Sequence, residues 1–439
     1  MVSTPGENLV YDVRLSSVVP ASITGEDKFH ELSNMDLIMK LHYLKGIYFF
    51  TSDAVRGLTV HDLKKPMFEC LALYSPSVSG RIRRSEDNGR PFIKCNDSGV
   101  RIAEAKSSKN LDEWLAFDDY SLNDQLIYSQ FLGPDLGFTP LVFVQFTWFK
   151  CGGISIGLSW SHILGDAFSA SHFINMWGQI LTGQVPSQHL DMSTIKNYNK
   201  TNKPLSPIAK VPLYLQRVQL DPLSGHWLIS NHNKMQCHSF HLTAKQLNHL
   251  TEAANLAKPF EVISAIIWKS LAKVRGKLLE PKIVTICSTR NAGSWDKKCE
   301  LPSNSQVKIS SIEVSEDADL PELAKLIANK QVDETNLIEE LIMAEKDDYD
   351  GMSRDFILYG AHLTFVNLEE IKIYEMELRG HQPIFASYSL SGVGDEGAIL
   401  VLPGPSSGKE KGGRVINLVL PENQLGELKY ELKREWGIC

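Results

Sequence analysis

Hydrophobic positions recur at helical and strand periods along the first half of the chain. The apolar residues of 62–74 recur at helical spacing and fall on one face, which predicts an amphipathic helix there. Residues 142–149 form an apolar run typical of a buried strand. A Gly-Gly turn at 150–153 leads into a second strand over 154–160, where apolar residues alternate with Ser and Gly. The apolar stripe within 170–181 predicts the helix that follows.

The second half repeats this pattern of strands and helices. A strand is expected near 236–242, then a helix with Phe260 and Val274 at the ends of its apolar face. A long helix is expected between Leu320 and Lys346, and the last helix from Pro421. Further strands are predicted at 282–288, 305–314, 361–366, 396–402 and 414–420. The Gly-, Ser- and Lys-rich segment 403–413 predicts a mobile loop between two strands.

The length of the chain predicts two lobes. A chain of 439 residues is too long for one hydrophobic core, and chains of this size divide into lobes. Residues 183–224 lose periodicity and collect Pro, Asn, Ser and Lys, so we expect a crossover linker there. The N-terminal lobe is then expected at 1–182 and the C-terminal lobe at 225–439.

Composition and charge exclude several classes of function. Hydrophobic residues make up 43% and charged residues 22%, which is ordinary for a folded protein. The formal net charge of −7 argues against nucleic acid as a partner and against direct electrostatic docking on anionic lipid.

Cysteine usage and hydropathy point to a cytosolic protein. The seven cysteines are scattered and form no CxxC pair, so we expect reduced thiols rather than disulfides or a zinc site. The N-terminal residues lack the basic and apolar regions of a signal peptide. The apolar run 141–149 is too short to cross a bilayer, so no direct membrane span is expected.

The informative constellation surrounds His162. The strand ends in Ser159-Trp160-Ser161, His162 follows, and Asp166 stands just before the next helix. Acyl transfer from a thioester needs a base to take the proton of the attacking hydroxyl or amine, and an imidazole suits that task at neutral pH. A base at a strand end is held rigidly and faces a cleft, and Asp166 is placed to fix the loop.

Each of these features also has a purely structural explanation. A lone histidine is more often a surface or satisfied core residue than a base, so spacing alone does not make His162 catalytic. Asp166 stands where a helix N-cap belongs, which is compatible with an orienting role. His238 and His241 resemble a metal pair, but on a strand they point to opposite faces, so we reject metal binding. The core is the expected place for Trp148, Trp160 and Trp177.

Several segments together resemble the plant BAHD acyltransferase family, and the resemblance runs nearly end to end. His162 to Asp166, after Cys151-Gly152-Gly153, matches its "CGG…HxxxD" pattern. The other matching segments are Leu32-Ser33-Asn34-Met35-Asp36, Leu63 to Arg81 ending in Tyr74-Ser75-Pro76-Ser77-Val78-Ser79-Gly80-Arg81, Cys95-Asn96-Asp97-Ser98-Gly99-Val100, and Phe260-Glu261-Val262-Ile263-Ser264-Ala265 with Trp268. This combination is far more specific than HxxxD alone.

The resemblance implies an α/β fold of two chloramphenicol-acetyltransferase-like lobes. Each lobe would hold a mixed β-sheet with flanking helices, and a channel at their interface would contain His162. CoA would enter from one side and the acceptor from the other. The family pattern makes His162 the general base and Asp166 the residue that holds the loop, facing Arg290. Glu377, at the acidic position of a second family motif, would be a further orienting residue.

Three departures from the family pattern concern this site. Active members usually carry Gly after the aspartate, where this chain has Ala167. The second motif, D-F-G-W-G, aligns with Glu377-Leu378-Arg379-Gly380-His381, so its aromatic pair and first glycine are gone and its turn is expected to lose backbone freedom. Leu301-Pro302-Ser303-Asn304 stands near the place of the family's "YFGN" segment. These losses predict an altered CoA side.

One branch of the family, the Eceriferum/Glossy group of cuticular-wax proteins, shares these departures. Its members resemble this chain at 13–22, 39–43, 157–166 and 363–368. The resemblance implies a role in extending very-long-chain acyl-CoAs beyond about 28 carbons for wax. It also implies partnership with a membrane-bound 3-ketoacyl-CoA synthase, which would hold this chain at the cytosolic face of the endoplasmic reticulum. In that group acyl transfer is not thought to be the working activity.

Three functions therefore remain open. The favoured hypothesis is an accessory protein of the fatty acid elongase that does not use acyltransferase catalysis. The second is a working acyl-CoA-dependent O- or N-acyltransferase with His162 as base. The third, a carrier-protein-dependent condensation domain, would show a second histidine where Ser161 stands. No metal or resident cofactor is expected, and acyl-CoA or CoA is the ligand that the resemblance implies.

Overall fold

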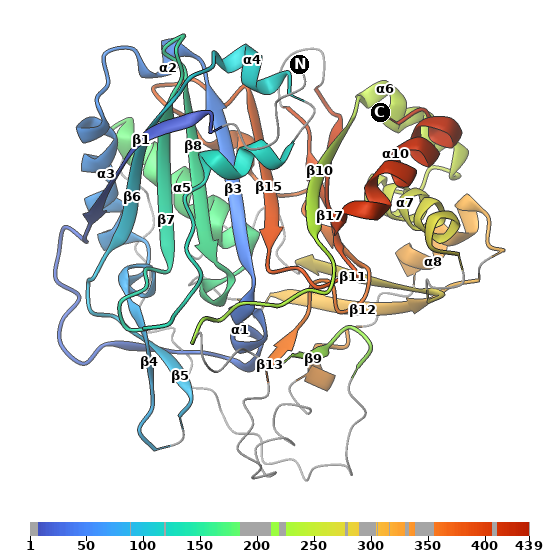
Figure 1. Ribbon diagram of the computed structural model, residues 1–439, viewed down its shortest axis with the longest axis horizontal. Coiled ribbons are helices and arrows are strands. Elements are labelled where there is room, and N and C mark those ends of the chain that lie inside the picture. Colours follow the sequence, from blue (N-terminus) through green and yellow to red (C-terminus); the bar gives the residue numbers. More distant parts are fainter. Residues whose placement is uncertain are drawn as a thin grey trace.

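Two mixed sheets of six strands each stand beside one another in the part of the chain that the computed structural model describes (Figure 1). The described residues are 8–87, 89–117, 120–184, 212–218, 225–276, 280–288, 304, 306–315, 317–329, 333–338, 355–405 and 411–438. Among them no helix is both long and apolar enough to cross a membrane.

The first sheet has the strand order β1-β6-β7-β8-β3-β15. Its strands are β1 Val10–Val18, β3 Tyr43–Phe50, β6 Val100–Ser107, β7 Val142–Trp148, β8 Ile154–Ser161 and β15 Phe385–Ser391. Side chains alternate between its faces. Tyr48 and Phe50 pack in the core with α3 (Val60–Leu73) and α5 (Ala167–Leu181), whereas Ile47 and Phe49 pack with α4 (Leu111–Leu115). The hairpin and both helices predicted at 62–74 and 170–181 are confirmed.

The second sheet has the order β10-β17-β16-β14-β11-β12. Its strands are β10 Met235–Leu242, β11 Lys282–Ser288, β12 Val307–Glu313, β14 Thr364–Asn367, β16 Ala398–Pro403 and β17 Arg414–Pro421. One face, with Phe365 and Ile399, packs in the core that includes α7 (Pro259–Arg275), α8 (Leu320–Asn329) and α10 (Glu422–Trp436). The other face, with Val366 and Leu400, belongs to the core of the first lobe.

Both faces of the second sheet are buried, and this determines where the candidate site lies. A strand buried on both faces carries apolar residues at consecutive positions, as β14 and β16 do. The inner face of the second sheet then meets the first lobe along a continuous apolar interface, and the candidate site lies in that interface. Polar side chains there are removed from water.

One strand of the predicted C-terminal lobe completes the sheet of the other lobe. Residues of β15 pair antiparallel with β3, with Tyr388 opposite Gly46. A Cβ at Gly46 would stand 2.8 Å from the Tyr388 ring, so the pairing requires glycine there. Strand β15 therefore links the two lobes, because separating them would break its backbone hydrogen bonds with β3.

The predicted strands at 282–288, 305–314, 396–402 and 414–420 are confirmed with small shifts of their ends. The strand predicted at 361–366 begins later, at Thr364. The helical region predicted between Leu320 and Lys346 is confirmed at α8 and again at 335–338, but it is interrupted at Asp333 and Glu334, which are not helical. The Asp333 carboxylate accepts from the Thr335 backbone N–H at 3.0 Å. Residues 339–354 and most of the expected crossover 183–224 lie outside the described residues.

The remaining elements are short or peripheral. They are β2 Phe29–Glu31, α1 Asn34–Ile38, η1 Met39–Leu41, α2 Ser52–Val55, η2 Pro76–Ser79, β4 Arg81–Arg84, β5 Pro91–Lys94, η3 Tyr120–Leu126, η4 His162–Leu164, β9 Gln216–Val218, α6 Ala244–Ala253, β13 Asp355–Ile357 and η9 Ile373–Glu375. Strands β2, β5 and β4 form a small sheet, and β13 pairs with β9.

Candidate functional site

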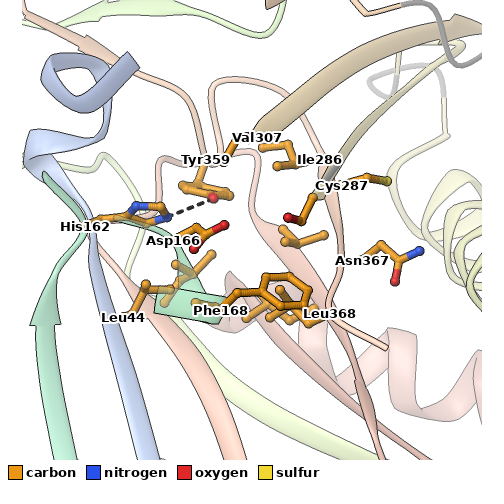
Figure 2. Close-up of a pocket in the computed structure, with 15 residues that line it drawn as sticks. Leu44, His162, Asp166, Phe168, Ile286, Cys287, Val307, Tyr359, Asn367 and Leu368 are labelled. Carbon is orange, nitrogen blue, oxygen red and sulfur yellow. Dashed lines mark hydrogen bonds between the residues drawn. The ribbon is translucent and has the colours of Figure 1, made fainter. Parts of the chain in front are cut away.

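A pocket between the two sheets contains His162 (Figure 2). The space between its lining atoms amounts to about 360 Å³, part of which is open to solvent. The lining residues come from both lobes: Leu44, His162, Asp166, Ala167, Phe168, Ile286, Cys287, Ser288, Val307, Tyr359, Val366, Asn367, Leu368, Leu390 and Leu400. Most are apolar, and the few polar groups gather at two ends, His162, Tyr359 and Asp166 at one and Cys287 and Asn367 at the other (Figure 2).

His162 is the first residue after β8, and its side chain is almost completely buried, with 1% exposed. Its backbone N–H donates to the His42 carbonyl at 3.0 Å, and its own carbonyl accepts from the Asn304 amide at 2.8 Å. Its ring nitrogen Nε2 lies 3.1 Å from the Tyr359 hydroxyl. Burial lowers the pKa of His162, so the ring is neutral near pH 7.

A second buried histidine supports this arrangement. Nδ1 of His42 donates to the Gly392 carbonyl at 2.6 Å, and Nε2 accepts from the Leu358 N–H at 3.2 Å. These partners define the tautomer. Burial, and then the neighbouring His162, lower the pKa of His42 to about 3. Its ring stands edge-to-face against Tyr359, with centroids 4.9 Å apart. The sequence patterns did not single out His42 as a site residue, although it lies in the 39–43 segment noted above.

Asp36 and Asn304 form a buried bridge behind His162. The Asn304 side-chain amide donates to the Asp36 carboxylate at 2.9 Å, and its backbone N–H donates to the same oxygen at 3.1 Å. Asp36 also closes the capping box of α1 with Ser33. Asn304 is the last residue of the Leu-Pro-Ser-Asn segment that stands near the place of the family's "YFGN", and it supports the His162 backbone.

Asp166 is the N-cap of α5, as its position predicted. Its carboxylate accepts from the backbone N–H of Ser169 at 2.9 Å and from the Ser169 hydroxyl at 2.9 Å. Asp166 also lines the pocket. Gly165 before it has φ 149°, a conformation that favours glycine where η4 turns into α5. The pairing with Arg290 lies outside the described residues and stays a prediction.

Glu377 lies apart from the pocket lining. Its backbone packs against Gly178 of α5, where an added Cβ would meet the Glu377 carbonyl at 2.8 Å. Gly178 is three turns of helix, about 18 Å, from Asp166. The orienting role expected of Glu377 stays a prediction, and from this position it would act through α5.

The turn after Glu377 forms without the family's first glycine. Leu378 and His381 exchange two backbone hydrogen bonds of 2.9 Å, and Arg379 and Gly380 between them have φ values of 50° and 78°. The Arg379 guanidinium donates to the Arg56 carbonyl at 2.9 Å. Arg379, at the position of the family's first glycine, adopts the left-handed conformation that glycine would otherwise supply. The expected loss of backbone freedom stays a prediction.

The other candidate groups have structural partners. The Cys287 thiol is neutral, because burial raises its pKa to about 12, so it is not a nucleophile at neutral pH. The rings of both His238 and His241 contact Tyr120, and His241 Nε2 lies 2.9 Å from its hydroxyl. No group of three potential metal-ligating side chains occurs among the described residues.

Comparisons with known proteins agree with this geometry. The profile of the Transferase family matches residues 12–434. The chain belongs to the BAHD transferase family. It is 39% identical to Protein ECERIFERUM 2 of Arabidopsis thaliana, over 96% of this chain and 98% of that protein. It is 37% identical to Protein ECERIFERUM 26-like of the same plant, over 99% of this chain and 98% of that protein.

Solved BAHD-like structures confirm the fold. Vinorine synthase superposes with a TM-score of 0.72 at 19% identity, over 97% of this chain and 98% of that one. TRI101 of F. graminearum, solved with coenzyme A and deoxynivalenol, gives 0.67 at 15% identity, over 93% and 98% of the two chains. The BAHD family membership and the α/β fold of acetyltransferase-like lobes expected from the sequence are thus confirmed.

Proposed function

We propose that this BAHD protein is an accessory subunit of the fatty acid elongase for cuticular wax. It would bind very-long-chain acyl-CoA, partner a 3-ketoacyl-CoA synthase at the cytosolic face of the endoplasmic reticulum, and promote chain extension without acyl transfer. The observation that carries the proposal is the pocket between the lobes. Most of its lining residues are apolar, and Nε2 of His162 lies 3.1 Å from the Tyr359 hydroxyl.

The chemistry of the pocket fits a hydrocarbon chain better than a polar acceptor. Leu44, Ile286, Leu390 and Leu400 offer an acyl chain the apolar contacts that exclude water. Coenzyme A itself is supported by TRI101, a structural neighbour solved with it. The proposed role in wax is carried over from the ECERIFERUM proteins, to which this chain is 36–39% identical.

Co-expression in a host that makes only shorter acyl chains tests the proposal. The chain is expressed with a 3-ketoacyl-CoA synthase, and the acyl products are measured by gas chromatography. Wild type should lengthen the products, and His162→Ala should lengthen them equally. Complete loss of extension in a folded His162→Ala protein would overturn the accessory function.

A working acyl-CoA-dependent O- or N-acyltransferase remains the second candidate. His162 and Asp166 are both in place and line one pocket, which favours it. It predicts that purified protein releases CoA when given acyl-CoA and an alcohol or amine, and that His162→Ala abolishes this release. The two candidates therefore predict different effects of His162→Ala: the accessory function survives the substitution, whereas acyl transfer is lost.

A further inference from the structure

Tyr359 stands where the acceptor of an acyl transfer would have to stand. A general base in this family fold works by taking a proton from a hydroxyl or amine within hydrogen-bond distance of its ring nitrogen. Nε2 of His162 has such a hydroxyl 3.1 Å away, but it belongs to the protein. Figure 2 shows the Tyr359 ring on the side of His162 that faces the other lining residues.

The protonation states strengthen this contact. Burial, and then Asp166, raise the pKa of the Tyr359 hydroxyl, so it keeps its proton. The His162 ring is neutral near pH 7, since burial lowers its pKa. The phenol can therefore donate to the lone pair on Nε2, which is the lone pair that a catalytic base needs.

The backbone of Tyr359 is held in place on both sides. The Leu358 N–H donates to His42, and the Tyr359 carbonyl accepts from the Gly394 N–H at 2.9 Å. Gly360 has φ 81°, and a Cβ there would meet Gly394 at 2.4 Å. His42, which supports both Leu358 and the Tyr359 ring, stays neutral because its pKa is about 3. These contacts hold the backbone on both sides of the tyrosine, and a pH change near neutrality leaves the charge of His42 unaltered.

We propose that Tyr359 is a closure residue, which occupies the acceptor position on His162 Nε2 and keeps the intact HxxxD site from starting acyl transfer. This inference rests on the proposed non-catalytic function and supplies its structural cause. It assigns to Tyr359 a positioning role and not a catalytic one. The proposed acyl chain would lie along the apolar lining residues beyond the tyrosine, such as Leu390 and Leu400.

The chemical reactivity of His162 tests the closure apart from chain extension. Diethyl pyrocarbonate carbethoxylates an imidazole nitrogen only when its lone pair is free, and peptide mass spectrometry assigns the modified residue. In the wild-type protein His162 should react far more slowly than the exposed His61 and His232. Tyr359→Phe, which removes one oxygen and keeps the ring, should raise the rate at His162 about tenfold.

Tyr48→Phe is the matched control, because it also removes a buried hydroxyl, one that lies 2.9 Å from the Tyr388 hydroxyl. It should leave the rate at His162 unchanged. Burial alone also slows the reaction of wild-type His162, so the change of rate on removing the hydroxyl is the decisive result. If Tyr359→Phe does not fold, Tyr359→Leu is the second variant that removes the hydroxyl. Equal rates at His162 and His61 in wild type, or no change in a folded Tyr359→Phe protein, would overturn the closure. So would an acyl ester on Tyr359 after incubation with acyl-CoA, since the tyrosine would then be an acceptor. Chain extension plays no part in these results, so they can fail independently of the proposed function.

Discussion

The Asn304 amide and the Asp36 carboxylate meet at 2.9 Å in the buried space behind His162. Asn304 is fully buried, and the same amide also donates to the His162 carbonyl at 2.8 Å. One side chain of the C-terminal lobe therefore fixes both the capping box of α1 and the backbone of the candidate base. The amide nitrogen of Asn304 thus meets two buried acceptors, whereas its Oδ1 has no hydrogen-bond partner among the described residues.

Asn304→Ala should therefore destabilise the protein markedly. It leaves the buried Asp36 carboxylate with fewer donors, which costs about 1–3 kcal/mol. We expect the midpoint of thermal unfolding to fall by several degrees, measured by circular dichroism. Asn233→Ala removes an exposed amide that donates to Asp395 and should change the midpoint little. Equal effects of the two substitutions would show that the bridge contributes nothing beyond a surface contact.

Asp166 can be tested as a cap and as an ion-pair partner separately. Asp166→Ala removes the acceptor for the Ser169 N–H, and loss of an N-cap costs about 1 kcal/mol. Asp166→Asn keeps a good cap but loses the charge. If capping is the main role, only the alanine variant lowers the unfolding midpoint. If Asp166 also pairs with Arg290, as the resemblance implies, the asparagine variant falls with it.

Stability should decrease as the pH falls below about 6.5, because His42 is held neutral in the folded state. Its folded pKa is about 3, against 6.5 for the unfolded chain, so the unfolded state binds more protons between these values. Above pH 6.5 the histidine contributes no pH dependence. Below it the free energy of unfolding drops by up to about 1.4 kcal/mol per pH unit.

Urea unfolding at several pH values between 4.5 and 7.5 measures this slope. His42→Gln lowers stability overall through its lost hydrogen bonds, yet the slope below pH 6.5 should become shallower. His61→Gln, at an exposed position, should keep the wild-type slope. A slope unchanged in His42→Gln would mean that other groups cause the acid sensitivity.

Filling the pocket should impair chain extension where removing the imidazole does not. Ala167 lines the pocket and is 3% exposed, so Ala167→Leu projects three further carbons into it. We expect shorter acyl products in the co-expression assay, because overpacking of a closed apolar site excludes a chain. Ala167→Gly, which leaves the space open, is the control. Full extension by a folded Ala167→Leu protein would show that the acyl chain binds elsewhere.

Much of the fold was predictable because its signals are local. β11 was predicted with the bounds that it has, since its apolar residues run between Pro281 and a polar segment. Strands β1 and β15 were not predicted. Both alternate apolar and polar residues, as Tyr11, Val13 and Leu15 do in β1, so the strand period was there to be read. What no local pattern shows is that β15 pairs with β3, some 340 residues earlier. Pairing across that distance leaves no trace in a local window.

The candidate site likewise has features that are visible in short segments and features that depend on long-range contacts. The sequence by itself determined that His162 ends a strand, that Asp166 caps the next helix, and that the chain resembles BAHD acyltransferases, because strand period, capping chemistry and family motifs are all properties of short segments. Only the tertiary structure decided that Tyr359 meets His162 and that Asn304 supports it. These partners lie 197 and 142 residues away, and contacts so distant are set by how two sheets pack and not by the residues between them.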